Sequence, residues 1–400
     1  MNSVNDHKLL IVDDDPLVLE SVSSQVRMWG YDVLACGSAK EAMEKFLTGG
    51  IDLVLSDIRM PGISGAELLG MIREHDSDIP VILMTAYAEV EVAIDAVRKG
   101  ASDFIVKPFK PEYLQHAIEK GIRFRHLVEL EKNYTSMLEE KVRESEENLR
   151  AAAVIQQSLL PVSAPEATSF DFAWQFLPCE RIGGDLYNLF WLDETRLGVY
   201  VMDVGGHGVP AAMVTTSLAQ ALDPFSSRLL KRPIDTPPFY ELVSPAEVLA
   251  GLNRDYPIER FGKLLAICYL LLDTHSGKVL YSNAALPLPF LIRADGRVET
   301  LIEGGTIIGI GERAVYEEGE FLMEKGDRLF IYTDGIVEYL DKKGVPYGEE
   351  RLVRKLKEAG GEMLQMACTR VIQSLMSFGS DQRPEDDITL LGIEFQQPPA

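Results

Sequence analysis

The sequence predicts a multidomain protein in which an α/β doubly wound domain, a long helical linker and an α+β sandwich domain flanked by helices follow one another. Three observations predict this order. Short apolar runs alternate with amphipathic stretches over residues 1–111, a charge-rich helical pattern covers residues 112–160, and short strand patterns separated by turns and helices fill residues 161–400. A chain of 400 residues is also longer than one ordinary hydrophobic core requires.

In the first domain, four short apolar runs have the pattern of buried parallel strands, at residues 9–12, 53–55, 81–84 and 104–106. Helical patterns lie between or beside them, at residues 17–29, 39–47, 65–74 and 90–99. This alternation predicts a doubly wound parallel sheet. Asp15 stands just before the first helical pattern, where we expect it to cap the helix.

Acidic residues stand at the ends of two of these strands. Asp13 and Asp14 follow the first apolar run, and Asp57 follows the run at residues 53–55. Because the carboxyl ends of neighbouring parallel strands face one crevice, we expect these carboxylates to meet. A Mg²⁺ ion among them would offset their repulsion and attract a phosphoryl group, for which Asp57 is the candidate nucleophile. Thr85 and Lys107, at the ends of the other two runs, offer a hydroxyl group and a positive charge to phosphoryl oxygens.

Residues 8–110 resemble the response-regulator receiver domain. The resemblance rests on an acidic pair, a phosphoacceptor aspartate, a hydroxyl residue, an aromatic residue and a lysine–proline pair, here Asp13, Asp14, Asp57, Thr85, Phe104 and Lys107-Pro108. It implies a flavodoxin-like fold, a Mg²⁺ site at the three acids, phosphotransfer from a histidine kinase, and movement of Thr85 and Phe104 on phosphorylation. A receiver used only for docking is the alternative.

The linker carries a stripe of residues spaced by three or four, namely Leu127, Leu130, Tyr134, Leu138, Val142, Ser145, Leu149, Ala152 and Gln156. The stripe resembles a coiled-coil seam, and repeated steps of four between Tyr134 and Val142 predict a local unwinding of the supercoil. Because a helix of this length usually needs a partner, we expect a homodimer. The alternative is that the stripe docks on the chain's own domains. Pro161 is expected to end the helix.

The third domain mixes strand and helix patterns. Strands are predicted at residues 170–176, 189–192, 197–203, 264–273, 278–283 and 329–333, and helices at residues 210–222, 245–255, 348–358 and 363–378. Residues 223–244 are rich in proline and basic residues, and we expect a mobile loop there.

Four segments of this domain carry aspartates beside glycine or threonine residues. Asp185 follows two glycines, Asp203 ends an apolar strand and precedes Gly205, Asp334 stands between Thr333 and Gly335, and Asp386 and Asp387 precede Ile388-Thr389. Glycine lets the backbone approach closely, so these hard oxygen ligands are expected to converge on divalent cations. A pair of such ions lowers the pKa of a water molecule for in-line attack on a phosphoryl group, and no side-chain nucleophile is then needed.

Residues 153–394 resemble the PP2C-type serine/threonine phosphatases, in the branch of bacterial RsbU and SpoIIE. The matching segments are residues 155–161, 183–187, 203–208, 326–338 and 386–389. The resemblance implies two Mg²⁺ or Mn²⁺ ions. In it, Asp185 serves one metal, Asp203 bridges both with the help of the Val204 carbonyl, and Asp334 and Asp386 serve the other, with Asp387 as a further candidate ligand.

Some positions depart from this family pattern. Gly205 stands where the branch usually has serine, Asn188 where it has aspartate, and Asn283-Ala-Ala-Leu-Pro287, with Ala285 and Leu286 at its centre, where it has Asn-Ala-Gly-His-Pro. These changes leave the expected metal ligands in place and bear on substrate contacts and rate. For His207 two interpretations stay open: it orders the glycine loop, or it acts as a general acid.

Bulk composition excludes several classes of protein. A formal net charge of −23 and the lack of a basic recognition helix disfavour binding to nucleic acid or to anionic membranes. The sequence has neither an apolar run long enough to span a bilayer nor a signal-peptide core at its N-terminus, so we expect a cytoplasmic protein. Cys36, Cys179, Cys268 and Cys368 are widely scattered, which predicts reduced packing residues rather than a zinc site or disulfides.

The sequence therefore predicts a two-component response regulator in which phosphorylation at Asp57 controls a metal-dependent phosphoserine/phosphothreonine protein phosphatase. By resemblance alone, its substrate is expected to be a phosphorylated anti-sigma-factor antagonist. The alternative is a phosphorylation-controlled adaptor that binds a sigma factor or its regulators without catalysis.

Overall fold

The structure, a computed structural model, describes residues 7–86, 94–95, 97–179, 182–206, 208–311, 313–379 and 384–396. The chain divides into two compact units, Met1–Arg143 and Glu144–Ala400. The division falls inside the long helix α5 (Pro111–Gln157). The domain limits expected at residues 111 and 160 stay a prediction.

The first unit is built on a five-stranded parallel sheet with the strand order β2-β1-β3-β4-β5. Its strands are β1 (Lys8–Val12), β2 (Asp32–Cys36), β3 (Leu53–Asp57), β4 (Val81–Ala86) and β5 (Asp103–Lys107). The sequence analysis missed β2. This strand lies at the edge of the sheet and is only partly buried, so it lacks the continuous apolar run that marks the central strands.

Helices cover both faces of this sheet. The helices α2 (Ala39–Phe46) and α3 (Gly65–His75) pack on one face, and α1 (Pro16–Met28) and the start of α5 pack on the other. Asp15 caps α1 by accepting the backbone N–H groups of Leu17 and Val18, which confirms that prediction. The helix predicted over residues 90–99 falls largely outside the described residues.

The second unit contains two antiparallel-rich sheets that face each other across a hydrophobic core. One sheet has the order β15-β12-β11-β8-β7, with β16 also paired to β12, and the other has the order β14-β13-β17-β18-β6. The strands are β6 (Phe170–Leu177), β7 (Leu186–Trp191), β8 (Arg196–Val204), β11 (Leu265–Asp273), β12 (Lys278–Ala284), β13 (Phe290–Ile292), β14 (Val298–Thr300), β15 (Gly304–Gly305), β16 (Gly319–Leu322), β17 (Arg328–Tyr332) and β18 (Ile388–Phe395).

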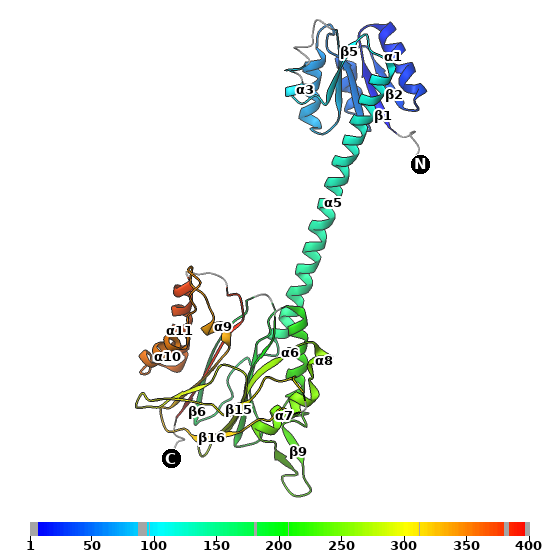
Figure 1. The fold of residues 1–400 in the computed structure, drawn as a ribbon. Helices are drawn as coiled ribbons and strands as arrows, with labels where there is room; N and C mark the ends of the chain where they lie inside the picture. The colour runs from blue at the N-terminus through cyan, green and yellow to red at the C-terminus, as the bar shows by residue number, and fades with distance from the viewer. Residues whose placement is uncertain are drawn as a thin grey trace. The chain divides into compact units, whose positions relative to one another are not determined.

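Helices form the outer layers of this sandwich. The helices α6 (Val209–Ala221) and α7 (Pro245–Asp255) pack against the first sheet, and α9 (Asp334–Val337), α10 (Glu349–Glu358) and α11 (Leu364–Gly379) pack against the second. Figure 1 shows these two groups of helices on opposite sides of the strands. A further short helix, α8 (Ile258–Phe261), follows α7. The predicted α+β sandwich flanked by helices is confirmed.

The segment at residues 223–244, expected to be a mobile loop, contains an antiparallel hairpin instead. Strand β9 (Lys231–Pro233) pairs with β10 (Tyr240–Leu242), and Leu230 and Val243 at the base of the hairpin are buried. Proline is compatible with such a short, peripheral ladder because it occupies turn and edge positions where no N–H donor is needed. The sequence signal for the hairpin is the pair of apolar residues that anchor it, Leu230 and Val243, and not the proline content of the segment.

Candidate functional site

The first unit brings several of the predicted receiver residues together at the carboxyl ends of its strands. Asp13 follows β1 and Asp57 ends the neighbouring β3, and both side chains are buried. Lys107, at the end of β5, donates from Nζ to Asp13 Oδ2 at 2.6 Å and also contacts Asp57 Oδ1. Thr85, at the end of β4, is buried and donates from Oγ1 to the carbonyl of Ala86 at 3.2 Å.

The electrostatics of this pocket suit a cation and a phosphoryl group. Burial raises the pKa of Asp57 and the nearby Asp13 adds to the rise, although the hydrogen bond from Lys107 opposes it. Burial alone would lower the pKa of Lys107, but its contacts with Asp13 and Asp57 outweigh burial and raise it. Asp14 is exposed beside this pair, and Phe104 is half-buried against the core of the domain. The carboxylate oxygens of the three acids are ligands of the kind that Mg²⁺ takes.

In the second unit, Asp185 is fixed by hydroxyl groups from two strand ends. Its side chain is 1% exposed, and Oδ2 accepts hydrogen bonds from Thr333 Oγ1 at 2.8 Å and from Thr389 Oγ1 at 2.5 Å. Thr333 follows β17 and Thr389 lies in β18, so the folded second sheet holds this carboxylate in one orientation. Two such donors also favour its charged form.

Asp387 connects the segments around this carboxylate. It is buried, and its two carboxylate oxygens accept the backbone N–H groups of Cys179 at 2.8 Å and Asp185 at 3.2 Å. A side chain on Gly183 would begin 1.8 Å from Asp387 Oδ2, and one on Gly335 would begin 2.0 Å from its carbonyl oxygen. The approach of these segments therefore requires glycine at both positions.

Asp203 stands near the end of β8, next to the loop of Asp185. A Cβ on Gly184 would lie 2.4 Å from the carbonyl oxygen of Val204 and 3.2 Å from Asp203 Oδ1, so only glycine leaves room for both oxygens. The Val204 N–H donates to the Gly184 carbonyl at 3.2 Å and holds the two segments together. A carboxylate oxygen of Asp203 and the carbonyl oxygen of Val204 thus lie close together beside Gly184. These are the two groups predicted to bridge the metal ions.

The acids of the second unit form one electrostatic cluster. Burial raises the pKa of Asp203 to about 7, with further contributions from Asp334, Asp386 and Asp387. Burial also raises the pKa of Asp185 well above its ordinary value, helped by Asp203 and Asp387, and it raises that of Asp334, helped by Asp386. Buried carboxylates that repel one another are stabilised by a shared cation. The donor set therefore fits hard divalent ions.

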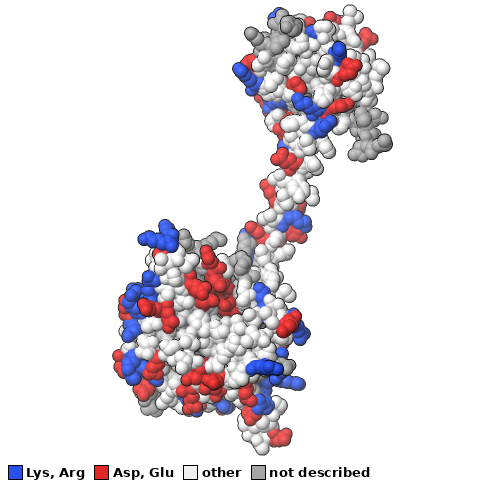
Figure 2. All heavy atoms as spheres, in the orientation of Figure 1, with Lys and Arg blue, Asp and Glu red and all other residues white. Residues whose placement is uncertain are grey.

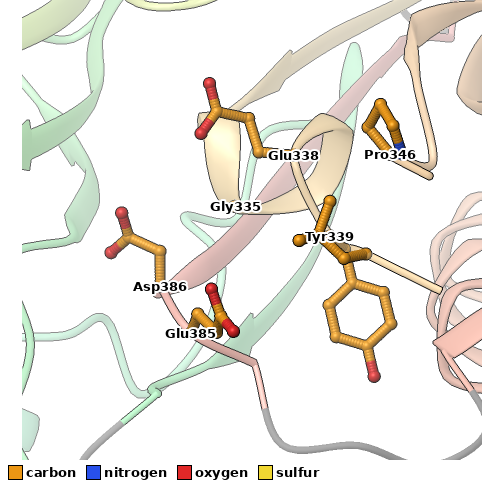
Figure 3. Close-up of a pocket in the computed structure, with 7 residues that line it drawn as sticks. Gly335, Glu338, Tyr339, Pro346, Glu385 and Asp386 are labelled. Atoms are coloured by element: carbon orange, nitrogen blue, oxygen red, sulfur yellow. The ribbon is translucent and has the colours of Figure 1, made fainter. Parts of the chain in front are cut away.

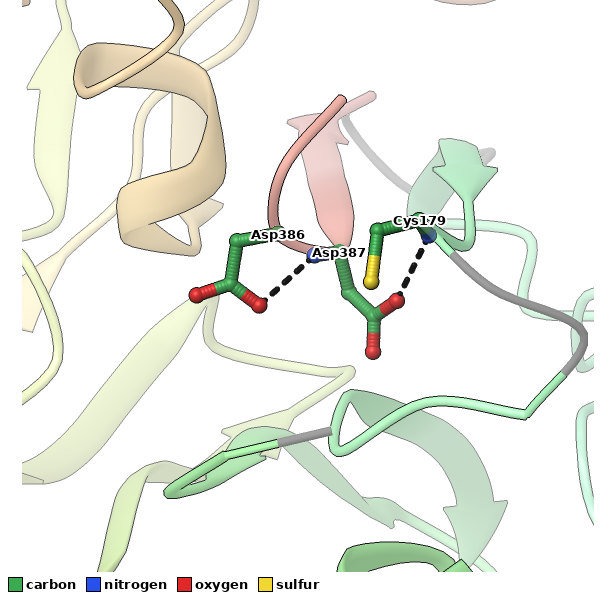
Figure 4. A group of neighbouring side chains, drawn as sticks. All are labelled: Cys179, Asp386 and Asp387. Carbon is green, nitrogen blue, oxygen red and sulfur yellow. Dashed lines mark hydrogen bonds between the residues drawn. The ribbon is translucent and has the colours of Figure 1, made fainter. Parts of the chain in front are cut away.

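Cys179 is a neighbour of this cluster that the sequence analysis missed. Ligand atoms of Cys179, Asp386 and Asp387 lie within 4.8 Å of one another. Figure 4 shows the Cys179 and Asp387 side chains next to each other, while the exposed Asp386 lies on the other side of Asp387 and accepts the Asp387 backbone N–H at 2.8 Å. The one signal in the sequence was the position of Cys179 shortly before Gly183-Gly184. The other cysteines, Cys36, Cys268 and Cys368, are buried as predicted.

The end of α5 touches the loop that carries Asp185. The amide of Gln156 donates from Nε2 to the Gly183 carbonyl at 2.8 Å and accepts the Gly183 N–H at 3.2 Å. Ala153 packs nearby with Ile182 and with Ala212 of α6. Leu149 and Ala152 join this cluster, so the last part of the predicted seam is occupied by the chain's own C-terminal unit.

Three further positions singled out by the sequence analysis bear on the family pattern. His207 lies outside the described residues. The carbonyl of Gly205 accepts a hydrogen bond from Lys263 Nζ at 2.8 Å. Ala285 has a φ of 63°, in the left-handed region that favours glycine, and it stands where the family pattern has glycine.

Comparisons with known proteins agree with this architecture. The model of the response regulator receiver domain matches residues 9–119, and the model of Stage II sporulation protein E (SpoIIE) matches residues 193–396. Among curated relatives, the response regulator protein FleR of Pseudomonas aeruginosa is 41% identical over 107 residues, which are 27% of this chain and 23% of FleR. The transcriptional regulatory protein ZraR of Escherichia coli O157:H7 is 37% identical over 123 residues, which are 31% of this chain and 28% of ZraR. The chain thus spans about a quarter of the length of these relatives.

Among solved structures, the SiaA-PP2C domain of Pseudomonas aeruginosa matches with a TM-score of 0.53 and 20% identity, over 64% of this chain and 99% of that one. This likeness supports the fold. The chain therefore joins a response regulator receiver domain to a SpoIIE domain with a PP2C-like fold. The chain belongs to the SpoIIE family, whose model covers just over half of its length. Both resemblances found in the sequence are confirmed. None of the helices in the described part of the chain has the length and hydrophobicity needed to cross a bilayer.

Proposed function

We propose that phosphorylation of Asp57 controls a metal-dependent phosphatase that acts on phosphoserine and phosphothreonine in a protein. The observation that carries this proposal is the electrostatic cluster of Asp185, Asp203 and Asp334, whose pKa values are all raised, together with the Val204 carbonyl that lies next to Asp203 beside Gly184. Such an arrangement is costly without cations and is suited to holding them.

Each acid has a distinct part in this proposal. Asp185 holds one ion, Asp203 and the Val204 carbonyl bridge two, and Asp334 and Asp386 hold the other. When bound, two Mg²⁺ or Mn²⁺ ions would offset the charge of the phosphoryl oxygens and activate water for attack. Asp387 keeps a mainly structural part, because both of its carboxylate oxygens already accept backbone N–H groups.

In the receiver, we assign the phosphoacceptor role to Asp57 and the Mg²⁺ site to Asp13, Asp14 and Asp57. A histidine kinase would supply the phosphoryl group. Lys107 already spans Asp13 and Asp57, so a phosphoryl group on Asp57 must change this contact. Thr85 and Phe104 are the residues proposed to respond to that change.

The chain is proposed to form a homodimer through the first part of α5. Leu127, Leu130, Tyr134, Leu138 and Val142 are each between 52% and 63% exposed, which leaves their apolar surface available to a second copy. The contact of Gln156 with Gly183 then places the end of the paired helix against the Asp185 loop. Control of the phosphatase is proposed to pass through this contact.

Membership in the SpoIIE family supports a protein substrate, and we propose a phosphorylated anti-sigma-factor antagonist in the cytoplasm. The test is release of phosphate from such phosphoproteins by the full chain, with Mn²⁺ or Mg²⁺, with and without acetyl phosphate. Asp203→Asn should abolish turnover, whereas Asp171→Asn, an exposed change in β6, should retain it. Tight binding of the phosphoprotein without any turnover would replace the phosphatase with the adaptor alternative.

A further inference from the structure

A cavity of about 570 Å³ adjoins the acidic cluster of the second unit. It is lined by Gly335, Glu338, Tyr339, Leu340, Pro346, Glu385 and Asp386. Figure 3 shows Glu338 coming from the end of α9, and Glu385 and Asp386 from the segment that leads into β18. Because Asp386 is both a wall of the cavity and a proposed metal ligand, any protein whose phosphorylated residue reaches the metals must place neighbouring residues near this cavity.

The cavity carries negative charge that its described lining residues do not neutralise. Three of its lining residues are carboxylates, and none of the described lining residues is a lysine or arginine. Some other exposed acids of this unit are paired, as Glu241 and Glu247 are with Arg232. Glu338 and Glu385 are exposed and have no ion-pair partner among the described residues. In Figure 2, acidic side chains gather on the surface over α9.

The rest of the cavity wall is largely apolar. The side chains of Tyr339, Leu340 and Pro346 line it, and Leu340 is 38% exposed. Lysine and arginine have an aliphatic stem that packs on such a surface and a charged end that seeks carboxylates. If Asp386 is committed to a metal ion, Glu338 and Glu385 remain available to bind the charged end.

We propose that this cavity receives a lysine or arginine side chain of the substrate protein that lies close to its phosphorylated residue. The inference rests on the proposed phosphatase function and adds a substrate class to it, namely phosphoproteins with a basic residue beside the phosphorylation site. The acids of the cavity attract that residue, and they repel substrates with acidic neighbours. Substrates are therefore distinguished by contacts beside the metal site, and not by contacts with the metal ions.

The test uses the full chain and a set of phosphoserine peptides that differ at one position. A single arginine is moved through the three positions on each side of the phosphoserine, and each peptide has a twin with glutamine in its place. We expect arginine at one or more positions to raise kcat/KM by about tenfold, mainly through a lower KM. In the double variant Glu338→Gln/Glu385→Gln, the ratio of kcat/KM between the arginine peptide and its glutamine twin should fall towards one. Glu318→Gln removes an equal charge from an exposed position before β16 and should keep the ratio.

Charge reversal gives a second test that does not depend on the absolute rate. In Glu338→Lys, a peptide with glutamate at the responsive position should become the better substrate. Thermal unfolding of each variant shows whether the fold is kept. Equal kcat/KM for all twins in the wild-type chain, with turnover still abolished by Asp203→Asn, would overturn the inference and leave the phosphatase proposal intact.

Two other outcomes would also overturn it. If the twins are equal and Glu338→Gln instead weakens the dependence on Mn²⁺, the cavity serves a metal ion and not the substrate. If neither peptides nor phosphoproteins are hydrolysed by the wild-type chain, the phosphatase proposal and the inference fail together.

Discussion

Replacing Asp203 with asparagine should change how the stability of the metal-free second unit depends on pH. Asparagine keeps the size of the side chain and removes its charge. In the wild-type chain, burial and the neighbouring acids raise the pKa of Asp203 from its ordinary value of 3.8 to about 7. Between these two values, the folded unit keeps a proton that the unfolded chain has lost. Without metal, the wild-type unit should therefore lose stability as the pH rises through this window.

The size of the effect follows from the width of the window. One fully bound proton contributes about 1.4 kcal/mol per pH unit. Because Asp203 is half protonated at pH 7, lowering the pH from 7 to 5 should stabilise the metal-free unit by about 2.3 kcal/mol through Asp203. For a unit of this size, this corresponds to a rise in Tm of about 5–10 °C. Asp203→Asn should remove this part of the dependence of stability on pH. The part that remains belongs to Asp185 and Asp334, whose pKa values are also raised.

Tryptophan fluorescence can follow the second unit alone. The three tryptophans are Trp29 in the first unit and Trp174 and Trp191 in the second. In a Trp29→Phe background, thermal unfolding in EDTA between pH 5 and pH 8 reports only on the unit that contains Asp203. Adding Mn²⁺ at pH 8 should raise the Tm of the parent protein and should have much less effect on Asp203→Asn.

A carboxylate elsewhere in the second unit provides the control. Asp171→Asn removes an exposed carboxylate from β6 of the same unit and should leave the slope as it is. If the metal-free parent protein is equally stable at pH 5 and pH 8, or if Asp203→Asn keeps the full slope, then the acids do not share a strained, buried cluster. The main support for the metal centre would then be lost.

Four further predictions concern control, metal affinity, assembly and strain. Asp57→Asn should abolish any response of phosphatase activity to acetyl phosphate, and an unchanged response would place the phosphorylation elsewhere. Gln156→Ala should lower the affinity for Mn²⁺, measured by calorimetry, because the Gly183 backbone loses two hydrogen bonds; a Gln156→Glu variant, which keeps only the acceptor, should be intermediate. Leu138→Lys should convert the dimer to a monomer in sedimentation, and a dimer of unchanged strength would show that α5 does not pair through this stripe. Ala285→Gly should raise stability by about 0.5–1 kcal/mol in chemical denaturation, because the φ of 63° suits glycine; a loss of stability would contradict the assigned strain.

Much of the fold could be predicted because its strands carry strong local patterns. The strands β1, β3, β4, β8 and β11 are continuous apolar runs, and each was found close to its true limits. The strands β2, β13, β14 and β16 were missed because they are short or partly exposed and depend on pairing with their neighbours. Strand β18 differs from these, because the apolar run after Asp387 is a clear strand pattern that the sequence analysis did not assign.

The acids of the candidate site could be predicted individually, but their different environments could not. Asp386 and Asp387 are adjacent in sequence, and the sequence favoured Asp386 as a ligand without separating their surroundings. In the structure Asp386 is exposed, whereas Asp387 is buried with both oxygens occupied by backbone donors. This difference arises from contacts with Cys179 and Asp185, which lie some 200 residues away along the chain. No local pattern encodes it.

Similar long-range contacts explain why the end of the linker helix and the candidate metal centre lie in one unit. Gln156 is a polar residue in a mostly apolar stripe, where a coiled-coil seam would offer its amide few polar partners. In the structure its amide satisfies the backbone N–H and carbonyl of Gly183, two residues before Asp185. A small displacement of the helix end must either break these bonds or move the Asp185 loop, because a buried amide and a buried peptide group are both costly to leave unpaired. The position of the helix end and the geometry of the acids are therefore energetically coupled.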